Sequence, residues 1–292
     1  DRETRPTWAR KRRRRGDGTL SDDEEYMGAV DRAYAMGERA APERGHKLAL
    51  AKSYPFMPPP RSIIWCAAGE FIFDAPPIDP LGGSPVFRGP ERAPASDALA
   101  MVGAHRSTPM SQRVPVIAYG ANRSPARLAE KFEDLVGPQS VVPMMKAELS
   151  GFDVVFSAHI AGYGAIPATL GFRPGVTVEV SVLYLDGPQL ERLDASEAIG
   201  INYERRRFSD LEMQVDGLGP LPIADAYISL HGCFDPGDGM ALALSAVPAV
   251  GRDLPSASGG EALNMARQQL DRDILLDDFI ARLGNDEDYR AR

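Results

Sequence analysis

Cysteine and histidine are scarce in this sequence, and their scarcity excludes two kinds of site. The 292 residues include 2 cysteines, Cys66 and Cys233, and 4 histidines that stand singly along the chain. No CxxC pair and no cluster of cysteine with histidine occurs, and these are the spacings of a disulfide framework or a structural zinc site. We therefore expect no metal site and a reducing compartment, the cytoplasm.

Long apolar runs are also missing. No stretch of the sequence approaches the roughly 18–20 apolar residues that a membrane-spanning helix requires, so we expect no membrane partner. The basic run Arg10–Arg15 is followed by Gly16, Asp17 and Gly18, where a secretory signal needs an apolar core. This run therefore does not indicate a signal peptide.

Positive charge is in deficit overall but is concentrated at one end. The formal net charge is −8, so the chain as a whole has no electrostatic reason to bind nucleic acid. We interpret residues 1–20, which include Arg10–Arg15, as a disordered and solvated basic tail. Binding of a nucleic acid or an acidic protein by this tail is the alternative.

Residues 21–112 predict a helix followed by an arm or linker rich in proline and glycine. Ser21 and Glu24 have the spacing of a capping box, and apolar residues continue at helical spacing, which predicts a helix over 22–40. From 54 to 110 prolines and glycines are too frequent for long helices or central strands. The apolar runs at 62–66 and 70–73 predict single short strands, and we assign the arm no function.

The character of the chain changes at Val114, and residues 113–292 predict a domain of mixed α and β structure. An apolar run over 114–119 indicates a strand broken by Gly120, after which Ser124 and Pro125 suit the N-cap and first position of a helix. Further strands are predicted at 152–156, 165–170, 176–185, 203–208, 211–215 and 223–230, and helical segments at 189–196 and 259–283. The strands are too closely spaced for repeated βαβ units, so the fold class is α+β.

The turn Tyr119-Gly120-Ala121-Asn122 is the first candidate binding feature. A glycine between a strand and a helix lets consecutive backbone N–H groups converge without interference from a Cβ atom. Such groups suit a carboxylate or a developing oxyanion. Glycine turns of this kind are common, so the turn alone indicates only a structural role.

The second candidate is the acidic end of the helix predicted at 189–196. Leu193-Asp194-Ala195-Ser196-Glu197 carries two carboxylates and is followed by Gly200 and Tyr203. Charged residues at helix ends usually face water, so Glu197 alone would be interpreted as a surface residue.

Taken together and in order, these segments resemble the γ-glutamylcyclotransferase-like superfamily. That family has a Tyr-Gly-Ser-Asn turn, three characteristic strands and a Leu-Asp-x-x-Glu-Gly helix end with a nearby tyrosine. The matching segments in this chain, within a resemblance that covers about residues 113–230, are 119–122, 151–156, 167–170, 178–184, 193–197 and Tyr203.

The resemblance implies a small mixed β-barrel with flanking helices, and a pocket at its mouth. In such enzymes the α-amine of a γ-glutamyl amide attacks its own γ-carbonyl, which forms 5-oxoproline and expels an amine. Glu197 would be the general acid and base, and the substrate would bind at Tyr119, Gly120, Ala121, Asn122 and Tyr203. The attack is intramolecular, so positioning supplies much of the rate, and the resemblance implies neither metal nor cofactor.

The chain departs from the family pattern at two positions. Ala121 replaces the usual serine and so keeps the backbone N–H but loses a hydroxyl, and Ala198 follows Glu197 where glycine is usual. A non-catalytic small-molecule or protein-binding module of the same fold is therefore the alternative function. Tyr203 is as compatible with packing as with binding, and Asp194 is expected to hold local structure.

Overall fold

The computed structural model describes residues 43–291. The basic tail and the helix expected over 22–40 lie outside the described residues. Within the described part, no helix combines the length and the apolar character needed to cross a membrane.

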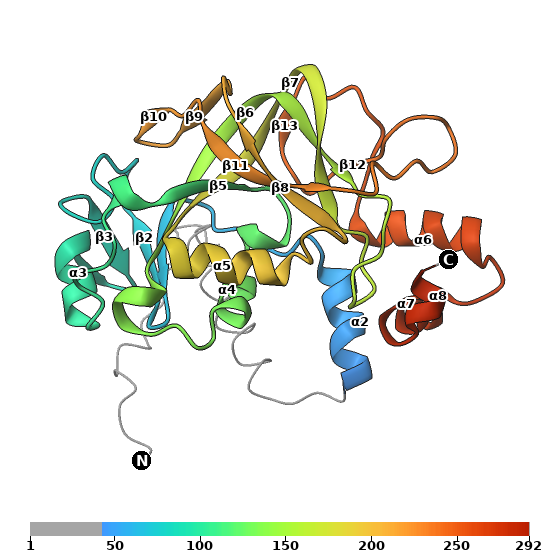
Figure 1. Ribbon diagram of the computed structural model, residues 1–292, viewed down its shortest axis with the longest axis horizontal. Coiled ribbons are helices and arrows are strands. Elements are labelled where there is room, and N and C mark those ends of the chain that lie inside the picture. The colour runs from blue at the N-terminus through green and yellow to red at the C-terminus, as the bar shows by residue number, and fades with distance from the viewer. Residues whose placement is uncertain (1–42, 292) are drawn as a thin grey trace, which may run out of the picture.

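One large sheet organises the described chain (Figure 1). Along its main path, neighbouring strands are antiparallel except β5 and β11, which are parallel. The main path runs in the order β4 (Glu91–Pro94), β3 (Pro85–Arg88), β2 (Gly69–Phe73), β1 (Ile63–Cys66), β6 (Val142–Phe156), β7 (Ala168–Leu185), β5 (Val114–Ala118), β11 (Ala224–Ser229) and β8 (Tyr203–Phe208).

The antiparallel pair β6 and β7 is the backbone of this sheet. Gly151 has φ 81°, which favours glycine, and the register between the two strands shifts there. Short strands pair along them: β9 (Met213–Val215) with the middle of β6, β12 (Ala243–Leu244) near the end of β6, and β13 (Ala249–Val250) with the middle of β7. Two further short strands are β10 (Gly219–Pro220), which pairs with β9, and β14 (Ser256–Ala257), which pairs with β12.

The mixed α+β class expected from the sequence is confirmed, but the closed barrel is not. Across residues 43–291 the end strands β4 and β8 pair with β3 and β11 respectively and not with each other. The sheet is therefore open. Strands β6 and β7 bend strongly but do not close it into a barrel (Figure 1).

The expectation that the proline-rich arm contains no central strand is wrong. Strand β1 lies between β2 and β6, in the interior of the sheet. The prolines at 58–60, 76–77 and 80 fall in the connections, so they remove no ladder hydrogen bond from β1 or β2. The ring of Trp65 in β1 packs 5.8 Å from that of Phe132, which joins this part of the arm to the domain.

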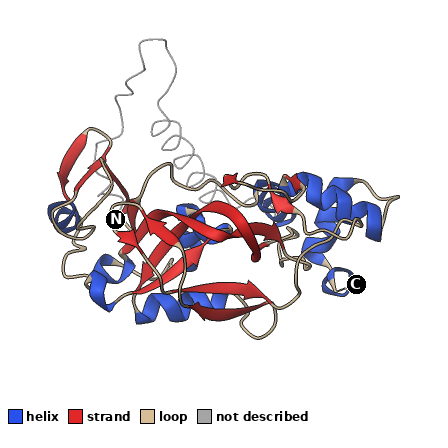
Figure 2. Cartoon of the chain, turned by 90° about the horizontal axis from the view of Figure 1, so that it is seen from above, coloured by secondary structure: helices blue, strands red, loops and turns tan. Residues whose placement is uncertain are grey.

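Helices flank the sheet, as Figure 2 shows. Helices α4 (Pro125–Lys131) and α5 (Gly187–Ser196) lie beside one another against its middle, in the places predicted from the sequence. The single helical segment expected over 259–283 is two helices, α6 (Gly259–Leu270) and α7 (Leu276–Asn285), with a break capped by Arg267. The others are α2 (Glu43–Ser53), α3 (Ala95–Met101) and α8 (Glu287–Arg290), with 3-10 turns η1 (Met110–Gln112), η2 (Ala121–Arg123) and η3 (Gly137–Ser140).

A buried ion pair fastens the C-terminal loops to the long strands. Asp153 of β6 is fully buried. Its carboxylate accepts hydrogen bonds from Arg252 Nε at 2.8 Å and from Arg252 Nη2 at 2.7 Å. Arg252 also donates to the carbonyl oxygens of Leu244 and Val247. Because the geometry is bidentate and the remaining donors are satisfied, this pair compensates the cost of burying a carboxylate.

We predict that Arg252→Met lowers the free energy of unfolding by about 3–5 kcal/mol, because Asp153 is left as an unpaired buried charge. The matched control is Arg173→Met, which breaks a bidentate pair with Asp253 at the surface. Exposed pairs contribute little, so the control should leave the urea midpoint almost unchanged. Equal midpoint shifts in the two variants would contradict the prediction.

Candidate active site at the end of β5

Strand β5 and the turn that follows it form one side of the candidate site. The strand ends at Ala118, and Gly120 precedes the 3-10 turn η2, whose end leads directly into α4. Ser124 has extended backbone as the N-cap of α4, and Pro125 occupies its first turn. The first N–H groups of a helical turn have no partner within it, so the main chain at Ala121 and Asn122 presents donors at this edge.

Glu197 reaches the same place from α5. It is the C-cap residue of this helix, and a capping box between Asp186 and Gln189 fixes the opposite end. The chain then turns through Ala198, whose φ of 49° lies in the left-handed region. This conformation explains why glycine suits that position, and alanine accepts it at a cost of roughly 1 kcal/mol.

The carboxylate of Glu197 meets the turn directly. Asn122 Nδ2 donates to Glu197 Oε1 at 3.1 Å, and Lys131 Nζ donates to the same oxygen at 2.6 Å. Lys131 Nζ also reaches Asn122 Oδ1 at 2.7 Å, so the three side chains form a closed triangle. The side chains of Glu197 and Lys131 are each 13% exposed. Within residues 43–291 the second oxygen, Oε2, has no hydrogen-bond partner.

Buried tyrosines surround this carboxylate. Burial is the main cause that raises the pKa of Tyr119, and the negative charge of Glu197 raises it further. The pKa values of Tyr203 and Tyr163 are raised in the same way, with burial first. These phenols therefore stay protonated and donate: Tyr203 Oη donates to the Ala168 carbonyl at 2.9 Å, and Tyr119 Oη donates to the Tyr227 carbonyl.

Tyr54, which follows α2, covers the glycine of the turn. Its Oη accepts the backbone N–H of Ala168 at 2.5 Å. A Cβ atom placed on Gly120 would lie 2.6 Å from this oxygen, so only glycine fits beneath the hydroxyl. The pKa of Tyr54 is raised by burial and by the neighbouring Tyr163.

Two histidines stack at the edge of the tyrosine cluster. The rings of His159 and His231 lie 4.8 Å apart, and His159 contacts the Tyr203 ring edge-on. Burial, and then His231, lower the pKa of His159 to about 4. His159 Nδ1 lies 2.7 Å from the buried Ser157 Oγ. His159 is therefore neutral at neutral pH.

The structure brings together the residues proposed from the sequence, and it gives Tyr203 and Asp194 mainly structural contacts. Tyr203 is buried against His159, while Asp194 accepts from Tyr227 Oη at 2.8 Å and from Arg205 Nε at 3.2 Å. Sequence reasoning missed Tyr54, Lys131, Tyr163, His159 and Arg127. Only Lys131 and Arg127 carried a local signal, because they lie on the helix that follows the turn.

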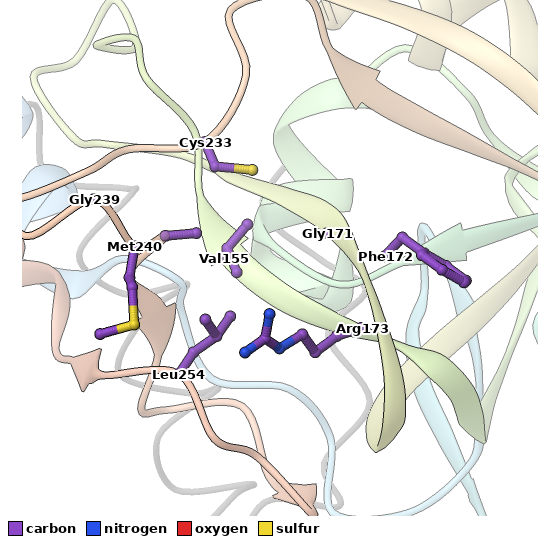
Figure 3. Close-up of a pocket in the computed structure, with 9 residues that line it drawn as sticks. Val155, Gly171, Phe172, Arg173, Cys233, Gly239, Met240 and Leu254 are labelled. Atoms are coloured by element: carbon purple, nitrogen blue, oxygen red, sulfur yellow. The ribbon is translucent and has the colours of Figure 1, made fainter.

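The hollow shown in Figure 3 is lined by none of these residues. It has a volume of about 330 Å³, and Arg173 extends toward Leu254 across it, with Cys233 and Met240 on the wall. Burial raises the pKa of the Cys233 thiol, so it is not an activated nucleophile. Across residues 43–291 no group of three or more His, Cys, Asp or Glu side chains is placed to hold a metal ion.

Comparison with known proteins gives a partial structural likeness. No protein-family model matches the chain, and no curated protein matches it. Among solved structures, the protein At5g39720.1 of Arabidopsis thaliana is 19% identical, with a TM-score of 0.34 over 44% of this chain and 76% of that one.

Two further structures have similar values. One described as a gamma-glutamyl cyclotransferase is 16% identical, with a TM-score of 0.34 over 53% of this chain and 79% of that one. The uncharacterized protein loc79017 of Homo sapiens is 16% identical, with a TM-score of 0.32 over 58% of this chain and 86% of that one. The chain therefore resembles γ-glutamylcyclotransferase-like proteins over part of its length, and at these scores its reaction has to be argued from the site itself.

Proposed function

We propose that this chain cleaves a γ-glutamyl amide or amine conjugate by cyclisation and releases 5-oxoproline and an amine. The observation that carries the proposal is the state of the Glu197 carboxylate. One of its oxygens is held against the Gly120 turn by Asn122 and Lys131, while Oε2 has no partner within the described residues. A partly buried acid beside main-chain donors suits proton transfer next to a polarised carbonyl.

In the proposed reaction Glu197 Oε2 accepts a proton from the substrate α-ammonium. The neutral α-nitrogen then forms a bond to the γ-carbon, and the carbonyl electron pair moves to its oxygen. Main-chain N–H groups of the turn at Gly120 and Ala121 would stabilise this oxyanion. Glu197 returns this proton to the leaving nitrogen and accepts the second proton of the α-nitrogen, which became positively charged on attack. When the oxyanion collapses, the γ-carbon–nitrogen bond breaks, and the second proton leaves with the amine as its ammonium. Neither an oxidant nor a second reactant is required.

Lys131 and the tyrosines suit this chemistry. Lys131 Nζ lies 2.6 Å from Glu197 Oε1 and fixes the direction of the carboxylate, so proton exchange is left to Oε2. The surrounding phenols remain uncharged, since their pKa values are raised by burial. They therefore exclude water from the site and add no negative charge that would repel a γ-glutamyl substrate.

One observation favours the alternative function, a non-catalytic binding module. The Tyr54 hydroxyl occupies the space above Gly120, where a bound acyl group would approach the main-chain donors. Turnover therefore requires Tyr54 to shift, whereas a binding module could keep it in place.

We predict that Glu197→Gln reduces release of 5-oxoproline by roughly 10²–10⁴-fold, because general acid–base catalysis contributes about that much. The assay would follow 5-oxoproline from a panel of γ-glutamyl amino acids and amines. Glu191→Gln, an exposed carboxylate on the same helix α5, is the matched control and should keep full activity. Lack of turnover by the unaltered protein across the panel would favour the binding module.

We also predict that Gly120→Ala destabilises the protein by about 1–3 kcal/mol, because the new methyl group overlaps Tyr54 Oη. Tyr54→Phe removes that oxygen. The double variant should therefore lose less free energy of unfolding than the sum of the losses in the two single variants. A double-mutant cycle of urea unfolding measures this coupling. Strict additivity would show that Tyr54 does not cover Gly120 in solution.

A further inference from the structure

Arg127 lies one helical turn before Lys131 on α4 and has an unusual environment for an arginine. Its guanidinium carbon is 5.1 Å from the ring centre of Phe56 and 5.6 Å from that of Tyr163. The side chain is 13% exposed. The centres of these two rings lie 6.3 Å apart, so the guanidinium packs against both rings from one side, and these contacts restrict its orientation.

One edge of this guanidinium makes no hydrogen bond to the described residues. Nη1 pairs with Glu130, a residue on the exposed side of α4. Within residues 43–291, Nε and Nη2 have no hydrogen-bond partner, and Nε is fully buried. A buried donor without a partner is destabilising, so a ligand that accepts from it gains affinity. The Nε–Nη2 edge is also the fork that binds a carboxylate through two parallel hydrogen bonds.

Arg127 and Glu197 border the same tyrosine cluster. Residues four apart share a helix face, and Lys131, four residues after Arg127, contacts Glu197. The phenol of Tyr163 lies close enough to both charges for Arg127 to lower its pKa and for Glu197 to raise it. An acid and an arginine thus border the same group of uncharged rings.

We propose that Arg127 binds the α-carboxylate of the substrate while Glu197 takes the α-ammonium, so that the site selects a zwitterionic amino-acid head. This proposal rests on the proposed function, because it assigns the substrate class of the same site. The Nε–Nη2 edge gives the carboxylate two charge-assisted hydrogen bonds, and Glu130 keeps its place on Nη1. Arg127 acts here as a specificity residue that lies outside the Gly120 turn.

The selectivity has a simple chemical consequence. An amide of 4-aminobutyrate carries the same amine and carbonyl as a γ-glutamyl amide but has no α-carboxylate, and its cyclisation gives 2-pyrrolidinone. If Arg127 recognises the carboxylate, the protein discriminates between the two cyclic products even when no bond is broken.

The test is calorimetric binding of 5-oxoproline and of 2-pyrrolidinone to the full chain. We expect the unaltered protein to bind 5-oxoproline about ten- to hundredfold more tightly, the factor that a charge-assisted pair supplies. Arg127→Met should abolish this preference, and Arg127→Lys should restore part of it as a point charge. Arg206→Met, an exposed arginine paired with Glu204, is the matched control and should keep the preference.

Two outcomes would overturn the inference: the unaltered protein shows no preference for 5-oxoproline, or Arg127→Met retains it. The parallel turnover assay separates this result from the proposed function. If the protein releases 5-oxoproline but its binding preference does not depend on Arg127, the reaction is supported and the role of Arg127 is contradicted. If the binding preference depends on Arg127 but no turnover occurs, carboxylate recognition is supported and the proposed reaction is contradicted.

Discussion

The pairing of Glu197 with Asn122 and Lys131 is the interaction on which the site depends. It joins the end of α5 to the turn after β5, two segments that are 75 residues apart in the chain. A carboxylate at a helix end is ordinarily solvated, and nothing within α5 would turn this one inward. The ammonium of Lys131 compensates the loss of water around the carboxylate, while the amide of Asn122 fixes its orientation. Ser196 Oγ also donates to Glu197 Oε1 at 3.5 Å, and uncharged phenols surround the group.

This arrangement also limits which ligands the site can accept. A second negative charge placed beside Glu197 would meet both the carboxylate and a poorly solvated surrounding, at a high electrostatic cost. A cationic group can approach Oε2, and an anionic group finds compensation near Arg127, whose guanidinium packs against Phe56 and Tyr163. The charges of α4 and α5 therefore favour a ligand that carries both a positive and a negative group. Such a ligand is compatible with catalysis and with simple binding.

Sequence reasoning succeeded where the signal is local. The start of α4 at Pro125, the course of α5 and the limits of β8 follow from capping residues and strand patterns within a few positions. The expectation that the arm holds no central strand was wrong for β1. The prolines lie in the connections of the arm, whereas β1 is a short apolar run between them. Sequence reasoning could not find Tyr54, whose partner Ala168 lies 114 positions away, since no periodicity in one segment encodes a contact with another.

The contact of Tyr54 with Ala168 and Gly120 changes the interpretation of the N-terminal arm. Division of the chain at about residue 112 followed a change in composition, yet the arm supplies an interior strand of the sheet and the hydroxyl that covers the turn. Gly120 is therefore constrained from two directions: the main chain must leave β5 there, and a phenol from the arm must fit above it. The second constraint is the one that requires glycine, because a Cβ atom on residue 120 would lie 2.6 Å from the Tyr54 hydroxyl oxygen. The arm therefore takes part in the candidate site through Tyr54, whose hydroxyl lies against Gly120 and accepts the N–H of Ala168.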